Sequence, residues 1–313
     1  MGCKTTTPPC VLLKYQILYS QFHSDSNDTE ISNPWTSLEP LLLSPSTHTT
    51  DYTVRNPLEA LAASSANIEV SEAMAQESVL LTGATGNVGA ITLEHLIRAN
   101  HKVNIVIRKT SAIAFFESKF ADAVKSGLLT FTVIPDMTVA GAFDGPSSSA
   151  TAIVHLATPL AGPGSDLVKE MIEPTWTIDE NILEAAKKSK TVKRVVICGS
   201  IVQTVLLPDF FNPSLVISEK NFNPITFEEA KNDPLSAYLF AKTDAEHKTW
   251  SWVETNRPDF DVVMLLPPLI AGRSPQPGYK PIANGPGGNS AVYTALLAGD
   301  AVQGVDNILP FVL

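Results

Sequence analysis

The chain has 313 residues, of which 44% are hydrophobic and 17% are charged, so it is not a wholly disordered protein. It carries 22 Lys and Arg against 32 Asp and Glu, a formal net charge of −10, which argues against the basic surface that nucleic-acid binding requires. Its three cysteines, Cys3, Cys10 and Cys198, are too scattered for a disulfide framework or a zinc site. No apolar run reaches the roughly 20 residues of a membrane-spanning helix. We expect a soluble, cytoplasmic protein with no metal site, no membrane span and no nucleic-acid partner.

Residues 1–73 differ in composition from the rest of the chain. They are rich in Ser, Thr and Pro and hold no Gly after Gly2. Their short apolar patches follow neither a period of two nor one of 3.6 residues. We predict a mostly disordered extension with one short helix near 58–64. The alternative is an irregular cap that packs on the main domain.

The start of the chain allows two further interpretations. Residues 1–6 read Met-Gly-Cys-Lys-Thr-Thr and fit the short, loose pattern for N-myristoylation, with Cys3 available for palmitate. Met74 lies shortly before the first predicted strand, so the residues upstream of it could instead be an accessory leader or a mistaken start. A secretory signal is not expected, because no continuous apolar core follows the Lys residues.

From Ser78 onward, short apolar strands alternate with helical patterns. Asp233 and Pro234 supply an N-cap and a first-turn proline for the last helix. Near-continuous apolar strands between helices indicate a parallel sheet covered on both faces. We predict a doubly wound α/β (Rossmann) fold, with a dinucleotide-binding domain over 74–267 and a partial substrate-binding region over 268–313. The expected strands are 79–82, 103–107, 128–134, 152–157, 192–198 and 261–266, and the expected helices are 87–99, 167–188 and 234–254.

The segment between the first strand and the first helix is rich in glycine. Glycines at this place allow a tight turn and let the backbone approach a pyrophosphate at the helix N-terminus. A strand-to-helix turn can need glycine for steric reasons alone, but here the flanking strands and helix fall where dinucleotide binding requires them. The expected cofactor contacts in this loop are Gly83, Ala84, Thr85, Gly86, Asn87 and Val88.

The end of the second strand predicts which dinucleotide binds. An acidic residue there accepts the ribose 2′-hydroxyl of NAD, whereas Arg accommodates the 2′-phosphate of NADP. This strand ends in Ile107, Arg108 and Lys109, with no carboxylate nearby. The two cations could be a solvated strand end, but beside a phosphate they form a sound electrostatic arrangement. NADP(H) is the expected cofactor.

Tyr238 and Lys242 stand four residues apart on the last predicted helix, so their side chains project from one face. A tyrosine is a poor acid–base group at neutral pH unless a nearby cation favours its phenolate. Ser200 ends the fifth strand, where strand ends in such sheets face the ligand crevice. These three residues are the predicted catalytic group.

These motifs occur in an order that carries a family resemblance. The chain resembles an extended short-chain dehydrogenase/reductase of the NAD-dependent epimerase/dehydratase superfamily, in the group of dihydroflavonol reductases and fungal ketone or aldehyde reductases. The resemblance covers roughly 78–272. The segments that carry it are Thr82–Gly89, His155–Pro159, Asn181–Ala186, Val192–Ser200, Tyr238–Lys242 and Pro267–Pro268.

The resemblance implies a role for each matching residue. Tyr238 would protonate a carbonyl oxygen as hydride arrives, Lys242 would favour the tyrosinate and bind the nicotinamide ribose, and Ser200 would hold the carbonyl. The implied activity is the NADP-dependent reduction of a small-molecule ketone or aldehyde. Asp136, after the third strand, would contact the adenine, and Leu156, Ala157 and Thr158 would line the cofactor.

Two positions depart from the family pattern. Small hydroxyl residues usually flank the position of Ser200, but here Cys198 and Gly199 stand there. A Gly-Thr pair usually precedes the position of Asn181, and here it is Ile178 and Asp179. Both changes put the local packing near the cofactor in question. We interpret Cys198 as a small hydrophobe, since no partner base is evident.

The sequence after the sixth strand leaves several functions open. The chain stops at an apolar run, 308–313, that resembles the start of a further strand. We therefore expect a shortened chain that binds NADP and catalyses poorly, because its crevice is exposed to water. The alternatives are a sugar-nucleotide epimerase or hydroxysteroid dehydrogenase of the same superfamily, and a redox-silent NADP-binding protein.

Overall fold

The protein is described by a computed structural model over residues 75–162, 164–212, 214–276, 279–281, 287–297 and 311–312. The predictions for residues 1–73 lie outside these residues, as does Met74. These predictions are the disordered extension, the helix near 58–64 and acylation at Gly2 and Cys3.

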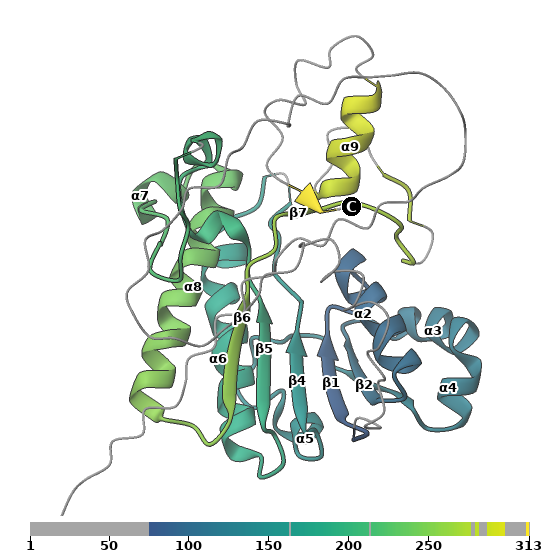
Figure 1. Ribbon diagram of the computed structural model, residues 1–313. Coiled ribbons are helices and arrows are strands. Elements are labelled where there is room, and N and C mark those ends of the chain that lie inside the picture. Colours follow the sequence, from purple (N-terminus) through teal and green to yellow (C-terminus); the bar gives the residue numbers. More distant parts are fainter. Residues whose placement is uncertain are drawn as a thin grey trace, which may run out of the picture. The chain divides into compact units, whose positions relative to one another are not determined.

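A six-stranded parallel sheet in the order β3-β2-β1-β4-β5-β6 forms the centre of the fold (Figure 1). This order starts from β1 and extends outward to both edges, so the predicted doubly wound α/β fold is confirmed. The strands are β1 Ser78–Thr82, β2 Lys102–Ile107, β3 Leu129–Val133, β4 Ala152–His155, β5 Arg194–Cys198 and β6 Asp261–Leu265.

Helices and short turns connect the strands. A second, two-stranded parallel sheet pairs β7 with β8, and β8 comprises residues 311–312 of the apolar run over 308–313. The remaining elements are α2 Asn87–Arg98, η1 Thr110–Ala112, α3 Ile113–Lys119, α4 Ala121–Lys125, α5 Asp144–Ser147, η2 Val168–Ile172, α6 Glu173–Lys188, η3 Ile201–Gln203, η4 Leu207–Phe211, α7 Phe227–Ala230, α8 Pro234–Asn256, β7 Leu269–Ile270, α9 Gly288–Leu297 and β8 Phe311–Val312.

The sheet buries an apolar layer on each of its faces. Leu80 belongs to the layer that packs against α6 and α8, and its neighbour Leu81 belongs to the layer that packs against α2, α3 and α4 (Figure 1). Both side chains are fully buried, and each contributes about 1.5–3 kcal/mol to stability through burial. Because successive residues of a strand point to opposite faces, the continuous apolar strands of the sequence are the expected consequence of this two-sided covering.

The helix α8 begins as its sequence predicts. The Asp233 carboxylate accepts a hydrogen bond of 2.7 Å from the Ser236 N–H, and Pro234 occupies the first turn. The helix ends at Arg257, which adopts a left-handed conformation with φ of 45°. This single rigid element carries both Tyr238 and Lys242.

Two predicted boundaries differ from the observed ones for identifiable reasons. The strand β4 ends at His155 rather than at 157, because the Leu156 and Ala157 N–H groups donate to the Thr82 hydroxyl instead of to a neighbouring strand. The helix predicted over 167–188 contains the π-helical segment η2 before α6. Pro174 follows this segment in the sequence, and a proline has no N–H to continue an α-helical ladder.

Candidate active site

The glycine loop between β1 and α2 depends on two glycines that no other residue could replace without strain. Gly83 has a φ of +75°, and a Cβ there would lie 2.7 Å from the Ala157 nitrogen. A Cβ on Gly89 would lie 2.1 Å from the Gly83 carbonyl oxygen. The first turn of α2 therefore packs directly on the loop backbone, and the loop packs directly on the segment after β4.

The N-terminus of α2 is prepared for an anion. Its N-cap residue, Gly86, has no side chain to cap the helix, and the first turn contains no acidic residue. The first N–H groups of a helix have no partner within the helix and attract negative charge. The Asn87 Oδ1 atom is buried and has no hydrogen-bond partner among the described residues. A donor group of a ligand would supply that hydrogen bond. These features fit the pyrophosphate and ribose of a dinucleotide.

Thr82, His155 and Asp179 form a buried polar chain beneath the loop. The Thr82 hydroxyl lies 2.7 Å from His155 Nδ1, and His155 Nε2 lies 3.1 Å from Asp179 Oδ1. All three are 5% exposed or less. Asp179 is thus the partner of a buried imidazole, which explains its departure from the family pattern. The sequence analysis did not predict these contacts.

Lys242 brings the predicted catalytic and cofactor-binding residues together. Its ammonium donates to the Thr158 hydroxyl at 2.7 Å and to the Cys198 carbonyl at 3.0 Å, and it is 7% exposed. It therefore bridges the segments after β4 and β5. Tyr238 lies one turn earlier on α8, half-buried beside an apolar cluster that includes Met171 and Ala241.

Ser200 follows β5 at the same edge of the sheet. Its backbone N–H donates to the Gln203 side-chain oxygen at 2.6 Å. Gln203 and its partner Glu246 were not found by the sequence analysis. Cys198 lies at the end of β5, two residues before Ser200. Burial raises the pKa of its thiol, so Cys198 is a poor nucleophile.

Arg108 and Asp136 lie in the exposed loops after β2 and β3. Arg108 makes no ion pair within the part of the chain that the structure describes, so its charge is available to a ligand. The Asp136 carboxylate accepts hydrogen bonds from the hydroxyl and the N–H of Thr138 at 2.6 Å and 2.9 Å, which lower its pKa. Asp136 thus presents an ionised carboxylate in a fixed turn.

A segment after β7, residues 273–276, reaches back to the glycine loop. The Gln276 amide donates to the Thr85 carbonyl at 2.8 Å. Arg273 forms an ion pair with Glu94 on α2, which also pairs with Lys119 at 2.7 Å. The hydrogen bond from Arg273 is the main cause of the lowered pKa of Glu94. The sequence analysis did not predict this connection.

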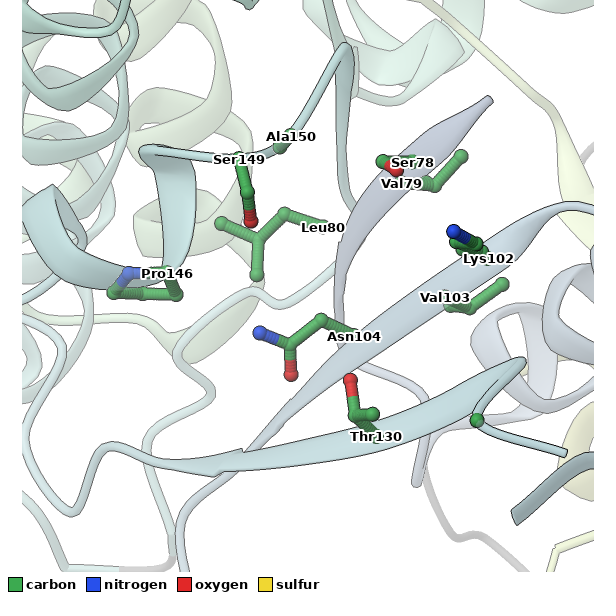
Figure 2. Close-up of a pocket in the computed structure, with 11 residues that line it drawn as sticks. Ser78, Val79, Leu80, Lys102, Val103, Asn104, Thr130, Pro146, Ser149 and Ala150 are labelled. Atoms are coloured by element: carbon green, nitrogen blue, oxygen red, sulfur yellow. The ribbon is translucent and has the colours of Figure 1, made fainter. Parts of the chain in front are cut away.

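A cavity of about 190 Å³ lies at the amino ends of β1 and β2, away from the strand ends that carry the candidate site (Figure 2). Its walls include Ser78 and Lys102, which begin β1 and β2. The carboxyl ends of parallel strands bind ligands in such folds, so this cavity is not the candidate site. Among the described residues no group of three or more His, Cys, Asp or Glu side chains could hold a metal ion, and no described helix is both long and apolar enough to span a bilayer.

Comparison with known proteins places this geometry in a family. A chain from Alternaria alternata described as an NAD-dependent epimerase/dehydratase is 36% identical over 222 residues, which are 67% of this chain and 60% of the relative. A ketoreductase from Cercospora nicotianae is 29% identical over 213 residues, 64% of this chain and 58% of the relative. The crystal structure of the yeast methylglyoxal/isovaleraldehyde reductase with NADPH is similar with a TM-score of 0.59 and 25% identity, over 63% of this chain and 59% of that one.

The matched region spans about two thirds of this chain and about three fifths of the length of each of these relatives. The resemblance to the extended short-chain dehydrogenase/reductases is confirmed. The family model described as the NAD dependent epimerase/dehydratase family matches residues 79–297, a range that holds the glycine loop, the segment after β4, Ser200 and the Tyr238–Lys242 helix. The chain belongs to the NAD-dependent epimerase/dehydratase family.

Proposed function

We propose that this protein is an NADP(H)-dependent oxidoreductase that reduces a ketone or aldehyde to an alcohol. The observation that carries the proposal is the position of Lys242. Its ammonium joins the loops after β4 and β5, through Thr158 and the Cys198 carbonyl. The same helix carries Tyr238 one turn earlier on the same face, and the N-terminus of α2 after the glycine loop has no side-chain cap. Similarity to a ketoreductase and to an aldehyde reductase solved with NADPH supports carbonyl reduction.

The chain's own residues would hold the cofactor and handle the proton. The N-terminus of α2 would bind the pyrophosphate, and Thr158 and Lys242 would meet the nicotinamide ribose. A bound nicotinamide supplies the hydride. The Tyr238 hydroxyl would donate its proton to the carbonyl oxygen, and the nearby Lys242 cation would stabilise the resulting phenolate. Ser200 would hold the same oxygen by a hydrogen bond.

The preference for NADP(H) over NAD(H) rests on Arg108. It directly follows β2, its charge is unpaired by any described residue, and no acidic residue neighbours it in the sequence to accept a ribose hydroxyl. A guanidinium recognises a phosphate by paired, charge-assisted hydrogen bonds. Reduction by NADPH suits a cytoplasmic location, which belongs to this proposal.

The test is NADPH oxidation by the purified full chain against a panel of ketones and aldehydes, with Tyr238→Phe beside the wild type. We expect carbonyl-dependent oxidation, and a loss of turnover of at least about 100-fold in Tyr238→Phe, because only the proton donor is removed. NADPH binding, followed by cofactor fluorescence, should stay within about twofold in the variant, since the phenol ring remains.

Other outcomes separate the competing functions. NADPH binding with no oxidation across the panel would contradict the proposal and favour a redox-silent binding protein. Epimerisation of a sugar nucleotide with no net consumption of the cofactor would favour the epimerase alternative. Retention of more than about a tenth of turnover in Tyr238→Phe would show that another group delivers the proton.

A further inference from the structure

A buried chain of side chains links α8 to the loop that carries Ser200. The Gln203 Oε1 atom accepts the Ser200 N–H at 2.6 Å, and its Nε2 atom donates to Glu246 Oε2 at 2.7 Å. The other oxygen of Glu246 accepts from the Trp250 indole N–H at 3.2 Å. Gln203 is 0% exposed and Glu246 is 3% exposed, so water cannot replace these contacts.

The packing around Gly199 shows that Gln203 has a fitted place in this loop. A Cβ on Gly199 would lie 2.3 Å from the Gln203 Oε1 atom. Any side chain at 199 would therefore displace the amide that accepts the Ser200 N–H. A Cβ at 199 would also lie 2.6 Å from the Leu266 Cδ2 atom, so Gly199 is required by the positions of both Gln203 and Leu266.

The helix α8 holds the backbone on both sides of Ser200. Lys242 donates to the carbonyl of Cys198, two residues earlier. Glu246, one turn further along the same face of α8, holds Gln203, which takes the N–H of Ser200. Because Tyr238 also lies on α8, a single rigid helix sets the position of Ser200 relative to Tyr238.

We propose that Gln203 and Glu246 are positioning residues that fix Ser200 against Tyr238 for the reaction. This inference rests on the proposed function. The alternative is that the pair only completes the polar bonds of a buried loop, as Asn223 does with the Val202 and Val205 carbonyls at 2.8 Å each. The two interpretations differ in whether the effect of Gln203 passes through Ser200.

The donors and acceptors in this row of hydrogen bonds allow the side chains at 203 and 246 to be swapped. In the double variant Gln203→Glu/Glu246→Gln, a carboxylate at 203 would accept the Ser200 N–H and an N–H from the new amide. The amide oxygen at 246 would still accept the Trp250 N–H. All three bonds and the single negative charge are kept. Gln203→Glu alone faces two carboxylates toward each other and loses the bond between positions 203 and 246. Glu246→Gln alone offers one acceptor oxygen where the carboxylate offers two, so the bond from Gln203 or the bond from Trp250 is lost.

The first measurement is hydrogen exchange of the Ser200 amide, which requires no substrate. We expect Gln203→Glu and Glu246→Gln each to raise its exchange rate by about tenfold or more, because the mismatched contact between positions 203 and 246 no longer holds the side chain that accepts the Ser200 N–H. The exchanged double variant should return to within about threefold of the wild-type rate. Unchanged exchange in both single variants, or no recovery in the double variant, would overturn the inference.

The second measurement is turnover with NADPH and a carbonyl reduced in the panel. Each single variant should lower kcat by about tenfold while the Kd for NADPH stays within about twofold, because neither residue touches the glycine loop. The exchanged double variant should recover kcat. In a Ser200→Ala background, Gln203→Glu should cause no further loss. An equal further loss there would show a structural role only.

The two proposals fail in different ways. If the wild type reduces no carbonyl, the proposed function fails. Hydrogen exchange of the Ser200 amide then still decides whether Gln203 and Glu246 fix the backbone at Ser200. If Ser200→Ala lowers turnover but the Gln203 variants do not, the inference fails and the proposed function stands. Should a single variant not fold, Gly199→Ala displaces the Gln203 amide with both residues intact, and it should likewise raise Ser200 exchange.

Discussion

Arg108 is the residue on which the proposed preference for NADP(H) rests. It directly follows the buried strand β2, and its side chain is exposed and makes no ion pair among the described residues. Arg194, on β5, is also exposed, but it pairs with Asp261 at 2.7 Å. An unpaired guanidinium at this strand end therefore has its charge free for a ligand phosphate.

Arg108→Ala should weaken NADPH binding by at least tenfold, because a charge-assisted contact contributes roughly 1.5–3 kcal/mol. Binding of NADH, which lacks the 2′-phosphate, should be nearly unchanged. Titration of both cofactors by fluorescence measures the difference, and Arg194→Ala is the matched control. Equal effects of Arg108→Ala on the two cofactors would contradict the assignment.

Site residues whose contacts are local in the sequence could be predicted, whereas those whose contacts join distant parts of the sequence could not. Tyr238 and Lys242 follow from helical spacing, and Asp233 from its capping position. Gln203 and Glu246 do not, because their contact joins residues 43 apart along the chain. No local period records such a pairing. Only the packing of α8 against the loop after β5 brings them together.

At the scale of elements, the junction of β1 and α2 is tightly constrained by its backbone packing. A Cβ on Gly89 would meet the Gly83 carbonyl oxygen at 2.1 Å, whereas one on Gly86 would meet the same oxygen at 3.2 Å. The first contact forces α2 away from the loop, and the second needs only a small adjustment. The two substitutions therefore form a graded pair.

Gly89→Ala should lower the free energy of unfolding by about 1–3 kcal/mol, the usual cost of overpacking. Gly86→Ala should cost clearly less, and both variants should be compared by urea denaturation. A larger loss in Gly86→Ala than in Gly89→Ala would contradict the packing argument.

Element boundaries were predicted less well than element types. All six strands of the main sheet were predicted in type and order, since buried parallel strands give continuous apolar runs. The early end of β4 was not, because it depends on the Thr82 hydroxyl, which belongs to another strand. The π-helical start before α6 was missed although Pro174 was visible in the sequence.

At the scale of the whole molecule, the main sheet and all predicted site residues lie after residue 77. A chain that begins at Met74 should therefore unfold at the same urea concentration as the full chain and bind NADPH with the same Kd. Parallel denaturation and cofactor titration of the two chains measure this. Loss of folding in the shorter chain would show that residues 1–73 act as a structural cap.

The contact between Gln276 and Thr85 also has a consequence for the order in which the protein is made. Its two partners are 191 residues apart, and Arg273 and Glu94 are 179 apart. A ribosome adds roughly 5–20 residues per second, so the glycine loop exists for roughly 10–40 s before Gln276 is synthesised. On the nascent chain, β1 and α2 are thus present well before the residues that fasten the loop. Throughout that interval the N-terminus of α2 lacks the contacts that residues 273–276 later make with the glycine loop and with α2.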